Sequence, residues 1–150
     1  MSTLADSQAR DAVLVRLRAL RPDSPRQWGK MNPHQMVCHL TDAFRMAYGE
    51  RKPSYGVTLL TRTLIKWIAL HTPLTWPHGV QTRPEVDQVA GGGTPPAEWD
   101  RDTAELARRI ENFHTLRSFP AHPIFGPLTH TEWGVWGYRH VDHHFRQFSA

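Results

Sequence analysis

The sequence predicts an all-α protein, a four-helix bundle of up-down-down-up order with a long crossover at residues 50–97 that carries an extra helix. Two observations predict this class. Four segments place apolar residues at the spacing of helices buried on one face, at residues 7–20, 33–48, 98–116 and 129–147. No run of alternating apolar and polar residues is long enough for a strand. A length of 150 residues fits one domain, 1–150, with a core of its own.

The first long helix is expected to bury a face that includes Val13 and Leu17, and Pro22 ends its pattern. The second helix has strong start signals. Its N-cap, first helical residue and capping-box partner are Asn32, Pro33 and Gln35. It is expected to continue to about Tyr48, because Gly49 commonly follows the end of a helix.

Residues 50–97 form the longest stretch between two long helices. One helix is expected within it, over 57–70, and the Pro- and Gly-rich run that follows is expected to be irregular. Arg62 and Lys66 interrupt this most apolar part of the chain, which is also shorter than the roughly 20 residues that cross a bilayer. The sequence therefore predicts no membrane partner.

The third and last long helices lie close together in the sequence. Apolar residues on one side of the third are Leu106, Ile110, Phe113 and Leu116. Pro120 follows its end, and the last helix begins with Thr129 as N-cap and Glu132 as capping-box partner, continuing to about Gln147. Because the link at 117–128 is short, these two helices are expected to be antiparallel neighbours.

Charge and cysteine content narrow the classes of function. The net charge is +4, but arginines alternate with acids along the helices and form no basic run, so no nucleic-acid partner is expected. Cys38 is the only cysteine, and the first residues lack the apolar core of a signal peptide, which together indicate a cytoplasmic protein. The ten histidines are the unusual feature, since neutral imidazole is a common metal ligand.

The last helix turns two histidines inward. His140 and His144 are four residues apart and fall within about 40° of each other, in a stripe that contains Trp133 and Trp136. A single buried histidine is usually a hydrogen-bonded core residue. When two imidazoles lie at this spacing in an apolar stripe, their ring nitrogens are harder to supply with partners without a shared ion. Metal binding is therefore the favoured interpretation.

A third histidine points toward this pair. His39 lies on the buried face of the second helix, about 10 Å beyond its start, whereas His34 and Cys38 point elsewhere. His140 and His144 lie roughly 5 to 12 Å from the end of the last helix, so the depths match if these two helices are antiparallel. The second and third long helices must then be parallel, and residues 50–97 provide the crossover that this requires.

Other polar and aromatic residues are weaker candidates. Trp136 lies beside His140 and is expected to wall a substrate pocket. Glu85 or Asp87, in the irregular stretch, could serve as a general base if that stretch folds over the pocket. The remaining histidines are expected on loops or helix ends, namely His71, His78, His114, His122 and His130.

The histidine-containing segments also carry a resemblance. NPHQMVCHL, combined with HVDHHFRQF at the end of the chain, resembles the DinB-like (YfiT-like) metal-binding four-helix bundles. WGKMNPHQM, GGTPPAEWD and HPIFGPLTHTEWG resemble one branch of that superfamily whose function is unassigned. The resemblance implies a Zn or Ni ion held by His39, His140 and His144, and a homodimer. Some relatives use low-molecular-weight thiols such as mycothiol or bacillithiol.

These observations lead to two hypotheses of function. The first is a metal-dependent enzyme of the transferase or hydrolase type, in which the three-histidine site activates a thiol or water for a small-molecule substrate. The alternative is a non-catalytic module that binds a small molecule or protein, with a structural metal or none. A closed site that recruits His143 or Asp42 as a fourth ligand would favour this alternative.

Overall fold

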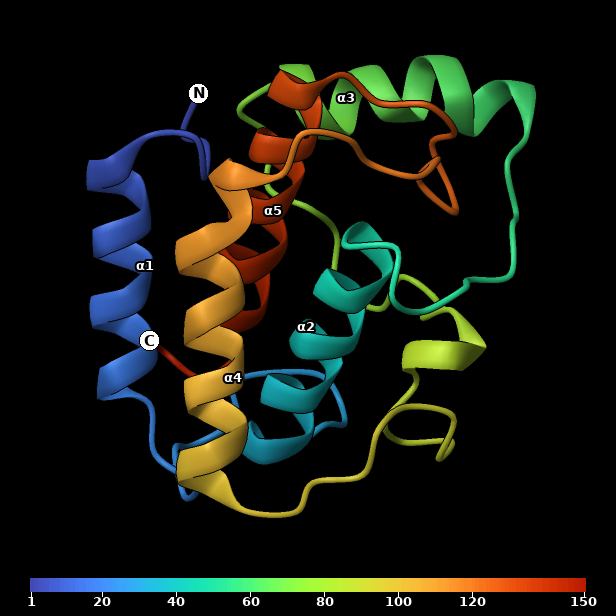
Figure 1. Cartoon of the computed structure of the whole chain (residues 1–150). Coiled ribbons are helices and arrows are strands. Elements are labelled where there is room, and N and C mark those ends of the chain that lie inside the picture. The colour runs from blue at the N-terminus through green and yellow to red at the C-terminus, as the bar shows by residue number, and fades with distance from the viewer.

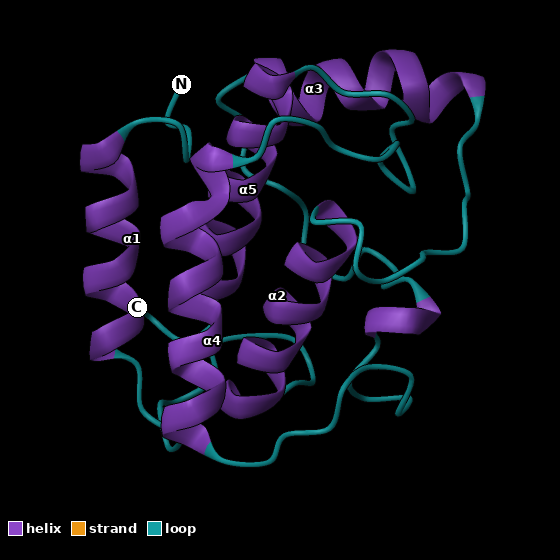
Figure 2. Cartoon of the chain, in the orientation of Figure 1, coloured by secondary structure: helices purple, strands orange, loops and turns teal.

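The computed structural model describes residues 1–150, and it is all-helical with no strand (Figure 2). Its five α-helices are α1 (Ser7–Ala19), α2 (Pro33–Ala47), α3 (Lys66–His71), α4 (Trp99–Asn112) and α5 (His130–Arg146). A π-helical turn (Thr61–Ile65) precedes α3, and two 3₁₀ turns are at Pro84–Val86 and Phe113–Thr115. The predicted all-α class is confirmed. No helix is both long enough and apolar enough to cross a membrane.

The predicted capping boxes are formed. The Asn32 side chain accepts a hydrogen bond from the Gln35 backbone N–H at 2.8 Å, and Gln35 Oε1 accepts one from the Asn32 backbone N–H at 2.9 Å. Thr129 and Glu132 exchange the same pair of bonds at the start of α5. Helix α4 ends earlier than predicted, because its last turn tightens into the 3₁₀ turn at Phe113–Thr115.

Four helices pack side by side around the core. Helices α1 and α2 each pack against both α4 and α5. In the view of Figure 1, α1 and α5 run downward, whereas α2 and α4 run upward. Helices α2 and α5 are therefore antiparallel, α2 and α4 are parallel, and the chain between α2 and α4 crosses from one end of the molecule to the other.

The predicted close packing of α4 on α5 is wrong in one respect. The two helices are antiparallel, but the main neighbours of α4 are α1 and α2. The link between them folds on itself through mutual backbone hydrogen bonds of His122 and Gly126, and Phe119 stacks on Trp133 at the start of α5. Because this link has packing contacts of its own, it can span the end of the molecule. Helices α4 and α5 therefore need not be adjacent.

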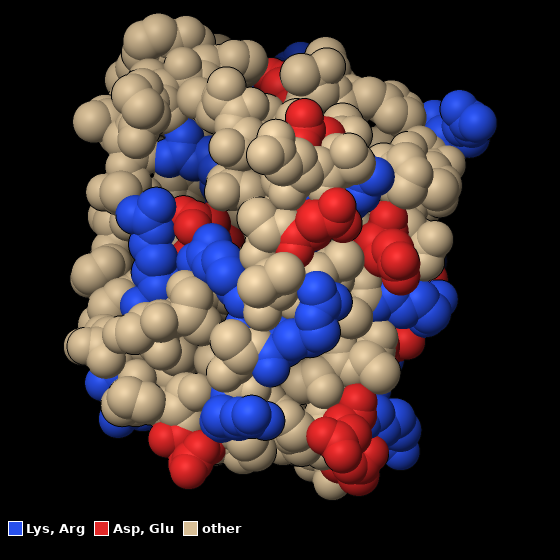
Figure 3. All heavy atoms as spheres, turned by 90° about the vertical axis from the view of Figure 1, so that its left-hand side faces the viewer, with Lys and Arg blue, Asp and Glu red and all other residues tan.

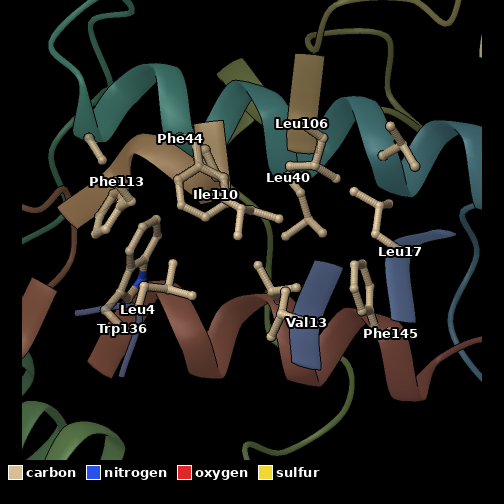
Figure 4. Packing of buried hydrophobic residues seen from close by; sticks show 14 of the residues in the cluster. Leu4, Val13, Leu17, Leu40, Phe44, Leu106, Ile110, Phe113, Trp136 and Phe145 are labelled. Atoms are coloured by element: carbon tan, nitrogen blue, oxygen red, sulfur yellow. The ribbon is translucent and has the colours of Figure 1, made fainter. Parts of the chain in front are cut away.

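Buried apolar side chains pack α2 against α5 (Figure 4). Phe44 of α2 is fully buried, and its ring contacts Phe113 edge-on at 5.2 Å and Trp136 of α5 at 6.1 Å. Leu4, which precedes α1, is also fully buried in this cluster. Each such side chain contributes about 1.5–3 kcal/mol through burial. The apolar contacts thus set the distance between the helices that carry the histidines.

The crossover is attached to the rest of the molecule at two polar points. Glu132 in the first turn of α5 pairs with Lys66 at 3.0 Å and with His71 at 3.2 Å. Asp42 of α2 is completely buried and accepts hydrogen bonds from the Thr94 backbone N–H and hydroxyl, each at 2.7 Å. The expected helix at 57–70 forms as one continuous helical segment over residues 59–71, in which the π-helical turn leads directly into α3, and several of its apolar side chains are exposed.

The charges of the surface are mixed in sign. Figure 3 shows the face on the α1 side, where acidic groups lie among the basic ones. Arg16 pairs with Asp142 at 2.7 Å, and Arg109 pairs with Glu105 and Glu50, each at 2.7 Å. Of these, only the Arg109–Glu105 pair lies along one helix, as the alternation of charges predicted, and Arg109 is buried and not on a solvated face.

Candidate metal centre

The three predicted histidines meet between α2 and α5. Potential ligand atoms of His39, His140 and His144 all lie within 4.8 Å of one another. His39 Nε2 and His140 Nε2 are 3.3 Å apart, and the ring centroids of His39 and His144 are 4.6 Å apart. The antiparallel packing of α2 and α5 brings the one-turn pair on α5 to the depth of His39, as the helix positions predicted.

Oxygen atoms outside the triad orient two of the rings. His39 Nδ1 is 2.9 Å from the Val86 carbonyl oxygen, and His144 Nδ1 is 3.2 Å from Gln147 Oε1. Because these oxygens can only accept, each Nδ1 donates its proton outward and each Nε2 keeps its lone pair. This is the arrangement in which a neutral histidine ligates a metal through Nε2 while a second group holds its ring.

The orientation of Gln147 is itself determined by its surroundings. Its Nε2 donates to the Trp28 carbonyl oxygen at 2.9 Å, which leaves Oε1 facing His144. Gly29 has a φ of +82°, and a Cβ at this position would lie 2.1 Å from Gln147 Nε2. Only glycine allows both this backbone conformation and this approach. Sequence reasoning missed Gln147, although a buried glutamine in the inward stripe of the last helix is a detectable signal.

Burial keeps the three imidazoles neutral. It lowers the pKa of His39, and it lowers the pKa values of His140 and His144 well below the usual value, with neighbouring histidines adding to the shift in both. At neutral pH all three rings are in the deprotonated form that metals require.

The donor set fits a transition metal. Two nitrogens that each lie 2.0–2.1 Å from a tetrahedral Zn²⁺ are roughly 3.3 Å apart, and the Nε2 atoms of His39 and His140 are separated by 3.3 Å. His140 Nδ1 is buried and has no hydrogen-bond partner. A buried imidazole nitrogen without a partner is costly, and the only hydrogen bond of the His140 ring joins its Nε2 to His39 Nε2, so Nδ1 stays unsatisfied.

Aromatic rings enclose the triad on two sides. Trp136 is buried, and its ring centroid is 5.0 Å from that of His140, so it lines the inner wall of the triad. Toward the surface, Trp76 lies 6.0 Å from His140, and His143 contacts His144 edge-on at 5.2 Å. Trp28 packs against His143 at 4.7 Å. Sequence analysis did not identify Trp28, Trp76 or His143 as neighbours of one another, because two of them lie on loops without periodicity.

The predicted acidic candidates have other partners. Glu85 accepts a hydrogen bond from the Ser54 backbone N–H at 2.9 Å, and Asp87 Oδ1 caps the backbone of Val89 and Ala90, each at 2.9 Å. The irregular stretch does reach the triad, but it does so with the Val86 carbonyl. Asp42 is occupied by Thr94 and two arginines, so it is not a fourth donor in this structure.

A second group of potential donors has a structural explanation. His34, Cys38 and Asp102 lie close enough to hold an ion. However, Asp102 Oδ2 already accepts from His34 Nε2 and from the Ala97 backbone N–H, each at 2.9 Å. Burial and the adjacent Asp102 raise the pKa of the Cys38 thiol to about 12, so the thiol is protonated at neutral pH. This cluster joins the start of α4 to α2.

His122 lies on the link between α4 and α5, as predicted, and it is buried there. Its Nδ1 accepts from the backbone N–H groups of Ile124 and Phe125, each at 3.2 Å. Burial lowers the pKa of His122 to about 3. The ring stacks on Phe125 at 4.7 Å, so His122 holds the turn before α5 and does not join the triad.

Comparisons with known proteins identify a family without an assigned activity. No curated protein matches the chain. No solved structure matches it. A family described as protein of unknown function (DUF1569) matches residues 4–150. Since this match covers nearly the whole chain, the protein belongs to the DUF1569 family.

Proposed function

We propose that this protein is a metal-dependent enzyme of the transferase or hydrolase type, with a DinB-like four-helix architecture. Its cofactor is a divalent transition metal, Zn or Ni, and its ligands are His39, His140 and His144. The observation that carries the proposal is the triad itself. Three neutral imidazoles converge within 4.8 Å, and outward hydrogen bonds from Nδ1 hold two of them with Nε2 unprotonated.

The number of donors favours catalysis over a structural role. Structural zinc sites have four protein ligands, whereas catalytic sites have three and leave a position for a reactant. No acidic or cysteine side chain joins the three histidines in the group. A divalent metal at this position supplies Lewis acidity, which lowers the pKa of a thiol or water.

The protein's own residues position the ligands and shield them from water. Val86 and Gln147 hold the rings of His39 and His144 in their ligating tautomers. Trp136 excludes water from the inner side, because it is buried among Phe44, Trp133 and His140. The outer side is bordered by Trp76 and His143, and a substrate must reach the site past these rings.

The test begins with metal content. Protein purified without an affinity tag is expected to contain about one transition metal per chain by elemental analysis. His39→Ala, His140→Ala and His144→Ala should each lower Zn²⁺ affinity at least tenfold, whereas His114→Ala, which removes an exposed loop histidine, should not. Wild-type protein that stays metal-free after incubation with Zn²⁺ or Ni²⁺ would refute the proposed centre.

Catalysis needs a separate measurement. The metal-loaded protein is expected to hydrolyse an activated ester such as 4-nitrophenyl acetate, or to add a low-molecular-weight thiol to an electrophile, faster than the metal-free protein and the His140→Ala variant. Metal binding with no such difference across the panel would favour the alternative of a non-catalytic binding module.

A further inference from the structure

A cavity of about 260 Å³ lies beside the metal centre. Its wall includes Pro73 and Trp76 from the chain after α3, and Tyr138, Arg139, His143 and Arg146 from α5. Trp76 connects this cavity to the triad. Its ring lies 5.7 Å from the guanidinium carbon of Arg139, which lines the cavity, and 6.0 Å from the ring of His140 in the triad.

Arg139 is a partly buried cation without an acidic partner. Its guanidinium group donates to the carbonyl oxygens of Thr72 and Leu74 and forms no ion pair. Carbonyl dipoles solvate a guanidinium group but carry no negative charge, so an anion at this wall is favoured.

The one acid that lines the cavity is already neutralised. Asp142 Oδ1 is 2.7 Å from Arg16, and its Oδ2 is 2.9 Å from Arg146. Both oxygens of this carboxylate are therefore taken by two arginines, and no ion pair joins it to Arg139. Arg139 and Arg146 thus give the cavity a cationic wall, and beside it the indole of Trp76 and the ring of Tyr138 offer apolar surface.

We propose that this cavity binds the oxyanion group of a small organic molecule, a carboxylate or a phosphate, through Arg139 and Arg146. The apolar part of the ligand lies against Trp76 and Tyr138. The volume lies just below the usual range of ligand pockets, roughly 300–1,000 Å³, and suits a molecule about the size of benzoate. This small organic anion is also the substrate of the adjacent metal centre. That second claim rests on the proposed function, whereas binding in the cavity does not.

Binding of simple probes tests the site. Benzoate and phenyl phosphate are titrated into metal-free and Zn²⁺-loaded protein by calorimetry, with benzamide as the uncharged control. At least one of the two anions is expected to bind in both forms, and to bind at least tenfold more tightly than benzamide. The tighter of the two identifies the preferred oxyanion. Equal or absent binding of all three compounds would overturn the proposal.

Variants locate the bound anion. Arg139→Gln is expected to weaken binding at least tenfold, and Arg146→Gln several-fold, because each removes one charge-assisted hydrogen bond. Arg18→Gln removes one charge from the exposed surface of α1 and should leave the affinity unchanged. If Arg139→Gln does not fold, Arg146→Gln decides the question, since its side chain is exposed and pairs only with Asp142. Wild-type affinity in Arg146→Gln would then overturn the site.

The metal distinguishes this proposal from the proposed function. Arg139-dependent binding to metal-free protein supports the cavity even if the triad proves to hold no metal. Binding that needs Zn²⁺ and is unchanged in Arg139→Gln would place the anion on the ion and overturn the cavity. With Co²⁺ in the triad, benzoate protons should relax much faster than with Zn²⁺. Equal relaxation rates would overturn the link between the cavity and the metal centre.

Discussion

Gln147 links the folded chain to the proposed metal centre, and Gln147→Leu isolates that link. The glutamine is almost completely buried, and it accepts from His144 Nδ1 while it donates to the Trp28 carbonyl oxygen. Leucine fills a similar volume but makes neither bond. Loss of a hydrogen-bond partner of a metal-ligating histidine typically lowers metal affinity about 10–100-fold, and each buried polar group left unpaired costs about 1–3 kcal/mol of folding stability.

A second substitution at the same position separates the two effects. Gln147→Glu keeps an oxygen acceptor for the His144 Nδ1–H but loses the donor to Trp28. It is expected to lower the free energy of unfolding of the metal-free protein while retaining Zn²⁺ affinity within about threefold of the wild type. Gln147→Leu is expected to lower both quantities. Gln27→Leu, at an exposed glutamine, is the matched control.

Two measurements distinguish these outcomes. Competition with a chromophoric chelator gives the Zn²⁺ affinity, and urea unfolding of the metal-free protein gives the stability. If folded Gln147→Leu binds Zn²⁺ as tightly as Gln27→Leu does, the Gln147 side chain does not set the ligating tautomer of His144, and the reasoning is refuted.

Three further predictions concern the residues that support the site. Asp42→Ala is expected to lower the free energy of unfolding in urea by about 3 kcal/mol, because Arg45 and Arg51 lose their buried carboxylate partner and Thr94 loses its hydrogen-bond acceptor. A decrease of less than about 1 kcal/mol would contradict this. Gly29→Ala should destabilise the chain by about 1–3 kcal/mol and weaken Zn²⁺ binding, because its φ and the approach of Gln147 exclude a Cβ; an unaltered melting temperature would disprove it. Burial would raise the pKa of Glu132, but bonds from Thr129, Lys66 and His71 hold that pKa at about 2, below its ordinary 4.5. The stability from this depressed pKa is present above pH 4.5 and is lost as the pH falls toward 2, by about 3 kcal/mol at most. The free energy of unfolding of Glu132→Gln should therefore depend less on pH in this range than that of the wild type. Identical acid-unfolding curves for the two proteins would count against this prediction.

Local signals in the sequence determined where two of the helices begin and which histidines face inward. A capping box is a contact between residues three positions apart, so Asn32 with Gln35 and Thr129 with Glu132 are readable without a fold. The inward direction of His140 and His144 follows from helical periodicity alone. Adding the depth of His39 was enough to predict that α2 and α5 are antiparallel.

Only the tertiary structure decided what surrounds the triad. The Val86 carbonyl, Trp28 and Trp76 come from segments without periodicity, and they reach His39, Gln147 and Arg139 through contacts between residues far apart in the chain. The same holds for the packing of α4, which followed the cores of α1 and α2 rather than the short link to α5. Helical periodicity specifies the direction of a side chain relative to its own helix axis. The partner that it meets depends on how loops and helices pack, which is a property of the whole chain.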